Sequence, residues 1–547
     1  MLLFSFVLCL FQHFGLWAAI SSPLSQAFFH ASSTNNTISW ENCGEISGRM
    51  FECGRLSVPL DYANPHDGEA SLSILRLLAD EDKRRGSLFT NPGGPGISGT
   101  GDYQRARSLD MMDQSGGEYD IVSWDIRGVN DTAPQVSCFD SQESADEFWA
   151  GSLWYEGVET NSSLRSSFDQ DQFYSHVDAE DTRLRALWKR CEERSGKILP
   201  FVPTSQGTAA NARDVARISD AIDGSGSEIN YWGFSYGSVL GQYIIALFPE
   251  RLGRMIVDGV VYAPIWGAEP AVEMYNHLLI DTDGAYYGFA TLCAQAGPDR
   301  CALASNGSTA DSILEEIRVL IQVLYDPYGD LDESLARSSS IRLYIFLRLQ
   351  DPRSWPTLAH YLKSQQDLVN SQDDEEKLLP LQAVTETYDE FHSEKSLKQD
   401  TQIWQQDFYS NYWSIFCSDG PEYDGTSTRD VFDTIVEARK LSDTFGPMCL
   451  GGAHAGGYPR DRAPWAALAT VKRFPTLPAA HTYVYTSLYA HWPPYMRDLV
   501  LRDGLKRSTK SRKNAFPEPT LTAGKFLVSP SLSVLVGVPQ SPAGNLE

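Results

Sequence analysis

The sequence has little of what nucleic-acid-binding and metal-binding proteins need. Over 547 residues, 45 Lys and Arg stand against 71 Asp and Glu, which gives a formal net charge of -26. Binding to a phosphate backbone requires a basic surface, so this charge argues against a nucleic-acid partner. No Cys-x2-Cys or His-x3-His spacing occurs, so we predict no metal site. The acidity suits a secreted enzyme, and it equally suits an ordinary solubilising surface.

Apolar stretches long enough to cross a membrane are missing after the first twenty residues. Residues 1–20 combine an apolar run at 2–10 with Gly and Ala at 15–19, as in a signal peptide, although no Lys or Arg precedes the run. An uncleaved anchor is the alternative, but His13 interrupts the run and leaves it too short to span. We therefore expect a secreted protein without stable membrane insertion after signal cleavage.

The cysteines agree with export. Apart from Cys9 in the leader, the number of cysteines is even, which in an exported chain predicts disulfides. These cysteines are Cys43, Cys53, Cys138, Cys191, Cys293, Cys301, Cys417 and Cys449. Local pairing, Cys43 with Cys53 and Cys293 with Cys301, is our interpretation, since sequence leaves the connectivity open. Sequons for N-glycosylation, which fit the secretory pathway, occur at Asn35, Asn130, Asn161 and Asn306.

Residues 229–241 hold the motif around which the chain is organised. A short β-prone run enters Gly-x-Ser-x-Gly at 233–237, and a helix-compatible run leaves it at 239–248. This pattern predicts a nucleophile elbow, in which Ser235 takes a strained backbone conformation and exposes its hydroxyl. Glycine is needed two residues on either side because a Cβ there would collide.

A second glycine motif, Asn-Pro-Gly-Gly-Pro-Gly at 91–96, directly follows a predicted strand. Consecutive glycines let the backbone approach a ligand and aim N–H groups at one point. In an acyl-transfer enzyme the Gly93-Gly94 loop would supply one oxyanion donor, and the N–H of Tyr236 the other. Taken alone, the loop is also compatible with a plain surface turn.

The order of predicted elements indicates an α/β fold. Strands are expected at 71–78, 87–90, 119–128, 229–232 and 255–261, and helices at 177–196, 211–222 and 239–248. This order fits a mostly parallel sheet covered by helices. Asp125 and Arg127, which follow a buried strand, are expected to form a structural ion pair.

Four of these motifs together resemble the α/β-hydrolase family of secreted tripeptidyl and prolyl aminopeptidases. They are 91–96, Asp125-x-Arg127-Gly128, 231–238 and Asp258-Gly-Val, and the resemblance covers residues 54–263. It implies a serine peptidase that releases short N-terminal peptides or single residues, with Ser235 as nucleophile and donors from Gly93, Gly94 and Tyr236. Serine chemistry of this kind needs no cofactor.

The resemblance also implies a division of the chain. After a signal peptide at 1–20, the first part of the core spans 21–263, a helical cap insertion spans 264–441, and 442–547 takes the place of the remaining core. Cap helices are expected at 312–324, 341–349, 355–368 and 380–388. Residues 415–419 resemble the return from cap to core. The aromatic residues of the cap either line a substrate pocket or pack helices, and include Trp404, Phe408, Tyr409, Tyr412 and Trp413.

The sequence lacks a recognisable acid and base for Ser235, which in this fold follow the serine. Family members carry an Asp-Pro-Val-Thr-Pro-like turn and a later Gly-His pair, and neither occurs here. The triad acid and His are therefore unknown. The remaining candidates are His454, His481 and His491 as base and Asp443 or Asp461 as acid, and for each of them an ordinary structural role is the favoured interpretation.

Three functions stay open. The first is a secreted serine hydrolase of the aminopeptidase type, acting on a peptide through an acyl-enzyme. The second is a catalytically inactive relative that keeps the elbow. The third is an esterase acting on small esters, since a fold does not determine its substrate.

The last stretch changes character, because residues 497–513 are basic in an acidic chain and the tail is rich in Pro, Gly and Ser. One hypothesis is a divergent tail. The other, which we favour, is an incorrect reading frame or exon junction that replaces the acid and the base with unrelated residues.

Overall fold

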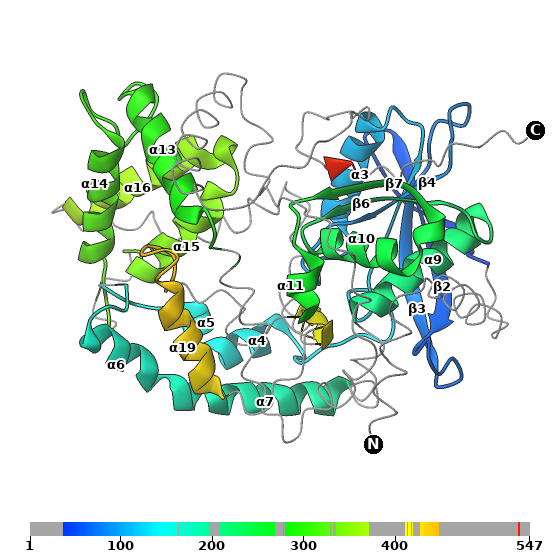
Figure 1. Ribbon diagram of the computed structural model, residues 1–547, viewed down its shortest axis with the longest axis horizontal. Coiled ribbons are helices and arrows are strands. Elements are labelled where there is room, and N and C mark those ends of the chain that lie inside the picture. Colours follow the sequence, from blue (N-terminus) through cyan, green and yellow to red (C-terminus); the bar gives the residue numbers. More distant parts are fainter. Residues whose placement is uncertain are drawn as a thin grey trace, which may run out of the picture.

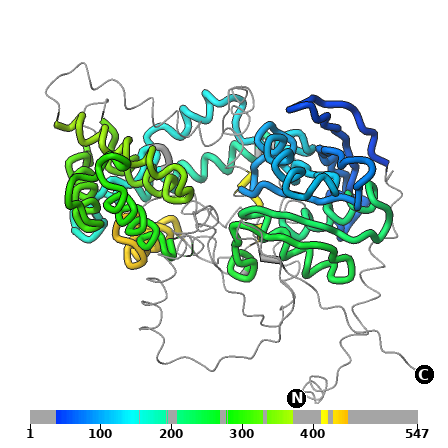
Figure 2. Tube along the Cα trace, turned by 90° about the horizontal axis from the view of Figure 1, so that it is seen from above, coloured from blue at the N-terminus to red at the C-terminus, as the bar shows by residue number. Residues whose placement is uncertain are grey.

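The computed structural model describes residues 37–161, 163–195, 207–268, 277, 279–328, 331, 335–370, 411–412, 414–416, 418–419, 427–447 and 534–535. They form a sheet lobe, with helices on its β-sheet, and a helical lobe (Figure 1). The two lobes are also distinct when seen from above (Figure 2). Helix α7 (Val177–Ser195) runs between them (Figure 1).

The sheet lobe contains a mixed eight-stranded sheet in the order β1-β2-β3-β5-β4-β6-β7-β8. Its strands are β1 (Glu41–Ile46), β2 (Arg49–Pro59), β3 (Glu69–Leu77), β4 (Ser87–Asn91), β5 (Asp120–Trp124), β6 (Ile229–Phe234), β7 (Leu252–Asp258) and β8 (Val534–Leu535). Among the described strands, only the central strands β5, β4, β6 and β7 pair in parallel. The expected mostly parallel sheet is therefore wrong for the outer strands, which pair antiparallel.

Strand β6 shows why the sheet is covered on both faces. Ile229 and Tyr231 join one buried cluster, whereas Trp232 and Phe234 join another, as expected when successive side chains point to opposite faces. Helices α9 (Thr208–Asp223) and α10 (Tyr236–Leu247) supply the first cluster, and α3 (Asp102–Gln114) supplies the second. The central strands are thus buried between helices, which explains their continuous apolar runs.

Some elements of the sheet lobe were not predicted from the sequence. Strands β1 and β2 form a hairpin where a polar entry segment was expected, and α3 follows the glycine loop. The buried positions of α3 include Gln104 and Ser108, whose side chains bond to one another at 3.3 Å. Because polar residues occupy part of its buried face, the helix has no clear apolar period.

The helical lobe packs α13 (Thr282–Ala296), α14 (Ala310–Val323), α15 (Ser338–Leu349) and α16 (Trp355–Asn370) around one apolar cluster. Three of the expected cap helices are thereby confirmed, and the helix expected at 380–388 lies outside the described residues. A capping box at Thr309 and Ser312 starts α14.

A second segment of the chain adds to the helical lobe. The helices α5 (Leu153–Glu156) and α6 (Ser167–Ser175) lie between β5 and β6 in sequence, after α4 (Gln142–Trp149). They share an apolar cluster with α19 (Thr428–Ala438), where the rings of Phe173 and Phe432 stack at 4.4 Å. Conversely, Ile415 and Phe416 pack into the sheet lobe. The packing therefore crosses the expected boundaries at 263 and 441.

Disulfides join Cys43 to Cys53 and Cys293 to Cys301, which confirms both expected local pairs. A third, between Cys138 and Cys191, ties the end of α7 to the sheet lobe. Cys417 and Cys449 lie outside the described residues. Within the described ranges, no helix combines the length and apolarity that crossing a membrane requires.

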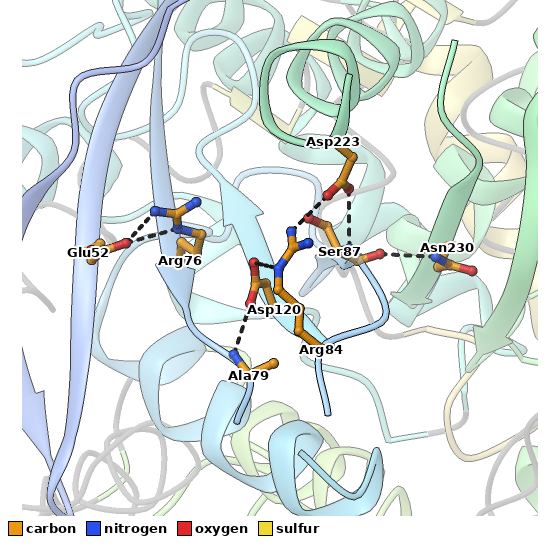
Figure 3. Close-up of polar contacts among 8 residues, drawn as sticks. All are labelled: Glu52, Arg76, Ala79, Arg84, Ser87, Asp120, Asp223 and Asn230. Atoms are coloured by element: carbon orange, nitrogen blue, oxygen red, sulfur yellow. Dashed lines mark hydrogen bonds and ion pairs between the residues drawn. The ribbon is translucent and has the colours of Figure 1, made fainter. Parts of the chain in front are cut away.

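Charged groups join the starts of the central strands (Figure 3). Arg84 donates to Asp120 at 2.8 Å and to Asp223 at 2.9 Å, and Asp223 also accepts from the N–H of Ser87 at 3.2 Å. Asn230 donates to the carbonyl of Ser87 at 3.2 Å. These contacts lie where β4, β5 and β6 begin, at the edge of the sheet opposite Ser235, so we assign them to stability.

Replacing Arg84 should test that assignment. In Arg84→Met the buried carboxylate of Asp120 loses its cation, and we expect the free energy of unfolding to fall by about 2 kcal/mol, because an unpaired buried charge is unfavourable. Urea unfolding followed by tryptophan fluorescence measures the change.

The adjacent Arg85 provides the matched control, since it pairs with Glu118 at 3.2 Å on the surface. Arg85→Met should change the free energy of unfolding by less than about 1 kcal/mol. Equal effects of the two variants would contradict the assignment.

Candidate active site

Ser235 stands between the end of β6 and the start of α10 in a strained conformation. Its φ is 53° and its ψ is -118°, and the residue is exposed although its neighbours on both sides are buried. Its N–H donates to the carbonyl of Asp258 at 2.9 Å, and its own carbonyl accepts the N–H of Ser238 at 2.8 Å. These bonds hold a backbone conformation that is unfavourable by about 1–3 kcal/mol.

Glycine is required at position 237 because the end of the neighbouring strand β4 lies too close for a side chain. A Cβ there would lie 2.6 Å from the carbonyl oxygen of Asn91, at the end of the neighbouring strand. The predicted steric reason for this glycine is thus confirmed. The hydroxyl of Tyr231 also donates to the carbonyl of Gly237 at 2.8 Å, which fixes the first turn of α10.

The glycine loop lies directly against the serine. Gly93 has a φ of 108°, and a Cβ there would be 2.7 Å from the carbonyl oxygen of Phe234 and 2.9 Å from the Cβ of Ser235. Two segments that are more than a hundred residues apart in sequence therefore meet at the carboxyl end of the parallel strands. A side chain at Gly93 would displace the serine or the loop.

Of the three expected oxyanion donors, Gly93 is engaged elsewhere. Its N–H donates to Oδ1 of Asn91 at 3.0 Å. Within the described part of the chain, the N–H groups of Gly94 and Tyr236 have no acceptor, and the latter belongs to the first turn of α10, where N–H groups have no helical partner. We therefore expect the oxyanion hole to be formed by the N–H groups of Gly94 and Tyr236, without that of Gly93.

The expected ion pair between Asp125 and Arg127 is wrong. Arg127 instead pairs with buried Asp214, donating to its two oxygens at 2.7 and 2.8 Å, and Tyr62 donates to the same carboxylate at 2.7 Å. Burial and the charge of Asp214 raise the pKa of Tyr62. Both residues follow the end of β5 at Trp124, where the chain has left the strand, and each finds its partner on another element.

Asp125 anchors the far end of the glycine loop. Its carboxylate accepts from the hydroxyl of Ser98 at 2.7 Å, the N–H of Gly99 at 2.8 Å and the hydroxyl of Thr100 at 2.8 Å. Burial raises the pKa of Asp125, and these hydrogen bonds act in the opposite direction. The side-chain amide of Asn130 also donates to it, at 2.9 Å.

A carboxylate that the sequence did not single out, Asp419, lies behind the elbow. It accepts from the N–H and the hydroxyl of Thr208 and, at 2.8 Å, from the indole N–H of Trp266. The Thr208 hydroxyl is also 2.8 Å from the hydroxyl of Tyr236. Burial raises the pKa of Asp419 to about 6. A signal existed, since Asp419 belongs to the segment 415–419, which resembles the return from cap to core, and Ile415 and Phe416 of this segment pack into the core.

The candidate acid Asp443 is placed away from these groups by its contacts. It forms an ion pair with Arg165, and both side chains are more than half exposed. The other candidates, His454, His481, His491 and Asp461, lie outside the described residues. The acid and the base for Ser235 are therefore not identified among the described residues, and these histidines and Asp461 stay candidates. Within the described ranges, no three His, Cys, Asp or Glu side chains gather in a way that could hold a metal ion.

Comparison with known proteins finds relatives that are hydrolases. The chain is 33% identical over 229 residues to a tripeptidyl aminopeptidase of Streptomyces coelicolor, covering 41% of this chain and 38% of that protein. It is 30% identical over 284 residues to serine protease Hip1 of Mycobacterium tuberculosis, covering 50% of this chain and 46% of Hip1. It is 24% identical over 480 residues to carboxylesterase B of Mycobacterium tuberculosis, covering 85% of this chain and 81% of that protein.

No protein-family profile matches the chain. The matched region spans less than half of the length of the tripeptidyl aminopeptidase and of Hip1. The comparisons nevertheless confirm the resemblance drawn from the motifs, because over part of its length the chain is similar to a tripeptidyl aminopeptidase and to serine protease Hip1.

The contact between Gly93 and Ser235 can be tested by adding a single methyl group. Gly93→Ala should lower the rate of fluorophosphonate labelling of Ser235 by about 100-fold, since the added Cβ pushes the loop away from the nucleophile. Labelling at several times, read on a gel, gives the rate.

Gly86→Ala is the matched control. Gly86 also has a positive φ, of 125°, but an added Cβ would meet nothing within 4 Å. This variant carries the same backbone strain away from the serine and should label at the wild-type rate. An unchanged rate in Gly93→Ala would contradict the assigned contact.

Proposed function

We propose that this chain is a secreted serine hydrolase of the α/β-hydrolase fold, and that it acts as a peptidase releasing short peptides or single residues from N-termini. The observation that carries the proposal is the position of Ser235, exposed in a strained turn and in contact with the glycine loop. The relatives named tripeptidyl aminopeptidase and serine protease support the same chemistry.

In the proposed mechanism, Ser235 Oγ attacks the substrate carbonyl while a histidine takes the hydroxyl proton. Negative charge develops on the carbonyl oxygen, and the N–H groups of Gly94 and Tyr236 stabilise it. The amine leaves with a proton from the same histidine, and water hydrolyses the acyl-enzyme. His454, His481 and His491 are the candidates for the base.

The helical lobe is proposed to be a cap over the sheet lobe. The chain leaves the sheet lobe after β7 through α11 (Ala263–Ala268), and residues 415–416 pack back into its core. This path supports an insertion between two parts of one α/β-hydrolase core. Such an insertion would limit the length of peptide that reaches Ser235, as an aminopeptidase requires.

Esterase activity is the second candidate function. The similarity to carboxylesterase B extends over most of the chain, whereas the similarity to the peptidases covers half of it or less. Because the same nucleophile and oxyanion donors serve both reactions, substrate preference must be measured.

Fluorophosphonate labelling of the purified chain tests the nucleophile. We expect labelling of the wild type and none of Ser235→Ala, because only a serine with a base in reach is activated. Tripeptide substrates with a free N-terminus should then be hydrolysed at least about 100-fold faster than N-blocked ones. Absence of labelling in the folded wild type would favour the inactive relative. Equal rates on free and blocked peptides, with faster cleavage of short esters, would favour the esterase.

Secretion predicts glycans at some sequons and not at others. The side-chain amide of Asn130 donates inside the cluster around Asp125, and Thr132 of the same sequon is buried, so a glycan is incompatible with this packing. Asn306 lies exposed in the loop before α14. We expect mass spectrometry of the protein secreted from a eukaryotic host to find a glycan on Asn306 and none on Asn130. A fully glycosylated Asn130 in active protein would contradict this prediction.

A further inference from the structure

A chain of hydrogen bonds connects Asp419 to the first residue of α10. Thr208 donates its N–H to one carboxylate oxygen at 2.8 Å and its hydroxyl to the other. Since the Thr208 hydroxyl uses its proton on Asp419, it can only accept from Tyr236, whose hydroxyl oxygen is 2.8 Å away. The carboxylate thus helps to orient the phenol through one intermediate hydroxyl, and the side chain of Asn211 is a second hydrogen-bond partner of the phenol.

Aromatic packing reinforces the same arrangement. The indole of Trp266 donates to Asp419 at 2.8 Å, and its ring lies 5.4 Å from that of Tyr236 and 4.3 Å from that of Phe416. Tyr236 is almost fully buried, with 1% exposure. Its ring therefore has a bonded end at the hydroxyl and a packed face at Trp266.

The backbone of Tyr236 is the part that matters for the reaction. The direction of its N–H depends on the peptide plane shared with Ser235, whose φ of 53° is unfavourable and tends to relax. Holding the ring of Tyr236 holds its Cα, and so restricts rotation of that plane. An oxyanion donor acts only when it is held within a few tenths of an ångström.

We propose that Asp419 is a positioning residue for the hydrolytic reaction: through Thr208 it locks the ring of Tyr236 and thereby aims the Tyr236 N–H at the developing oxyanion. This inference rests on the proposed function. It assigns a role in the reaction to Asp419, whose described contacts are with Thr208 and Trp266.

The proposal predicts a loss in turnover and not in substrate affinity. Asp419→Asn keeps the shape but has one acceptor oxygen, so it cannot accept both from the N–H of Thr208 and, at the other position, from the Thr208 hydroxyl and the indole of Trp266. Tyr236→Phe removes only the hydroxyl. With the best substrate at pH 8, above the pKa of about 6 that burial gives Asp419, Asp419→Asn and Tyr236→Phe should each lower kcat by about 10-fold and leave KM within about twofold, because the oxyanion forms only after binding. Thr208→Val should behave in the same way.

The double variant gives the sharpest result. If the three groups act as one chain, Asp419→Asn combined with Tyr236→Phe should lower kcat no further than the single variants, whereas independent effects would multiply to about 100-fold. Tyr361→Phe is the matched control, since it removes a buried hydroxyl of the helical lobe that has no partner among the described residues. It should leave kcat unchanged.

The outcomes separate this inference from the proposed function. No fluorophosphonate labelling of the wild type would overturn the proposed function. Normal labelling of the wild type, with kcat unchanged in Asp419→Asn, Thr208→Val and Tyr236→Phe, would overturn the positioning role alone. Multiplying effects in the double variant would also overturn it. If Asp419→Asn fails to fold, the comparison of Thr208→Val with Tyr236→Phe still decides.

Discussion

The strained turn at Ser235 is the constraint on which the sheet lobe depends. A non-glycine residue with φ of 53° and ψ of -118° persists only if its surroundings hold it there. Asp258 and Ser238 bind its N–H and carbonyl, and Gly237 lets the helix start close to the neighbouring strand. Burial of the central parallel strands between α9, α10 and α3 stabilises the fold and so offsets the unfavourable free energy of this turn.

The two edges of the sheet have different roles, one in the proposed chemistry and the other in stability. At the carboxyl edge, the glycine loop and the elbow expose backbone N–H groups and a hydroxyl, which stabilise little and leave groups available for chemistry. At the opposite edge, Arg84 joins Asp120 and Asp223, so polar groups there are satisfied by one another (Figure 3). This separation lets the strands stay fixed while the carboxyl edge keeps unsatisfied donors.

The helical lobe is connected to the sheet lobe by more than the chain itself. Phe416 and Asp419 return to pack beside Trp266 and Tyr236, directly behind the elbow. A change in the helical lobe therefore has a physical route to the candidate oxyanion donor through one buried carboxylate. The similarity to the named peptidases covers only part of the chain. Evidence for this route must therefore come from variants of this chain.

Local patterns were enough to predict the central strands, the elbow, the glycine loop and the two disulfides between nearby cysteines, because in each case adjacent residues carry the constraint. The partners of Asp125 and Arg127 were not predictable, since side chains at a strand end choose among elements that only packing brings near. Helix α3 was missed because its buried face includes Gln104 and Ser108.

The sequence by itself determined which residues make the turn at Ser235 and the loop at 91–96, since turn chemistry depends on Gly, Pro and Ser at fixed spacings. Tertiary structure alone decided that Gly93 lies against Ser235 and that Asp419 binds Thr208 across a separation of 211 residues. The reason is physical: a contact between distant segments depends on the sheet order and helix packing that bring them together, and no local pattern records that order.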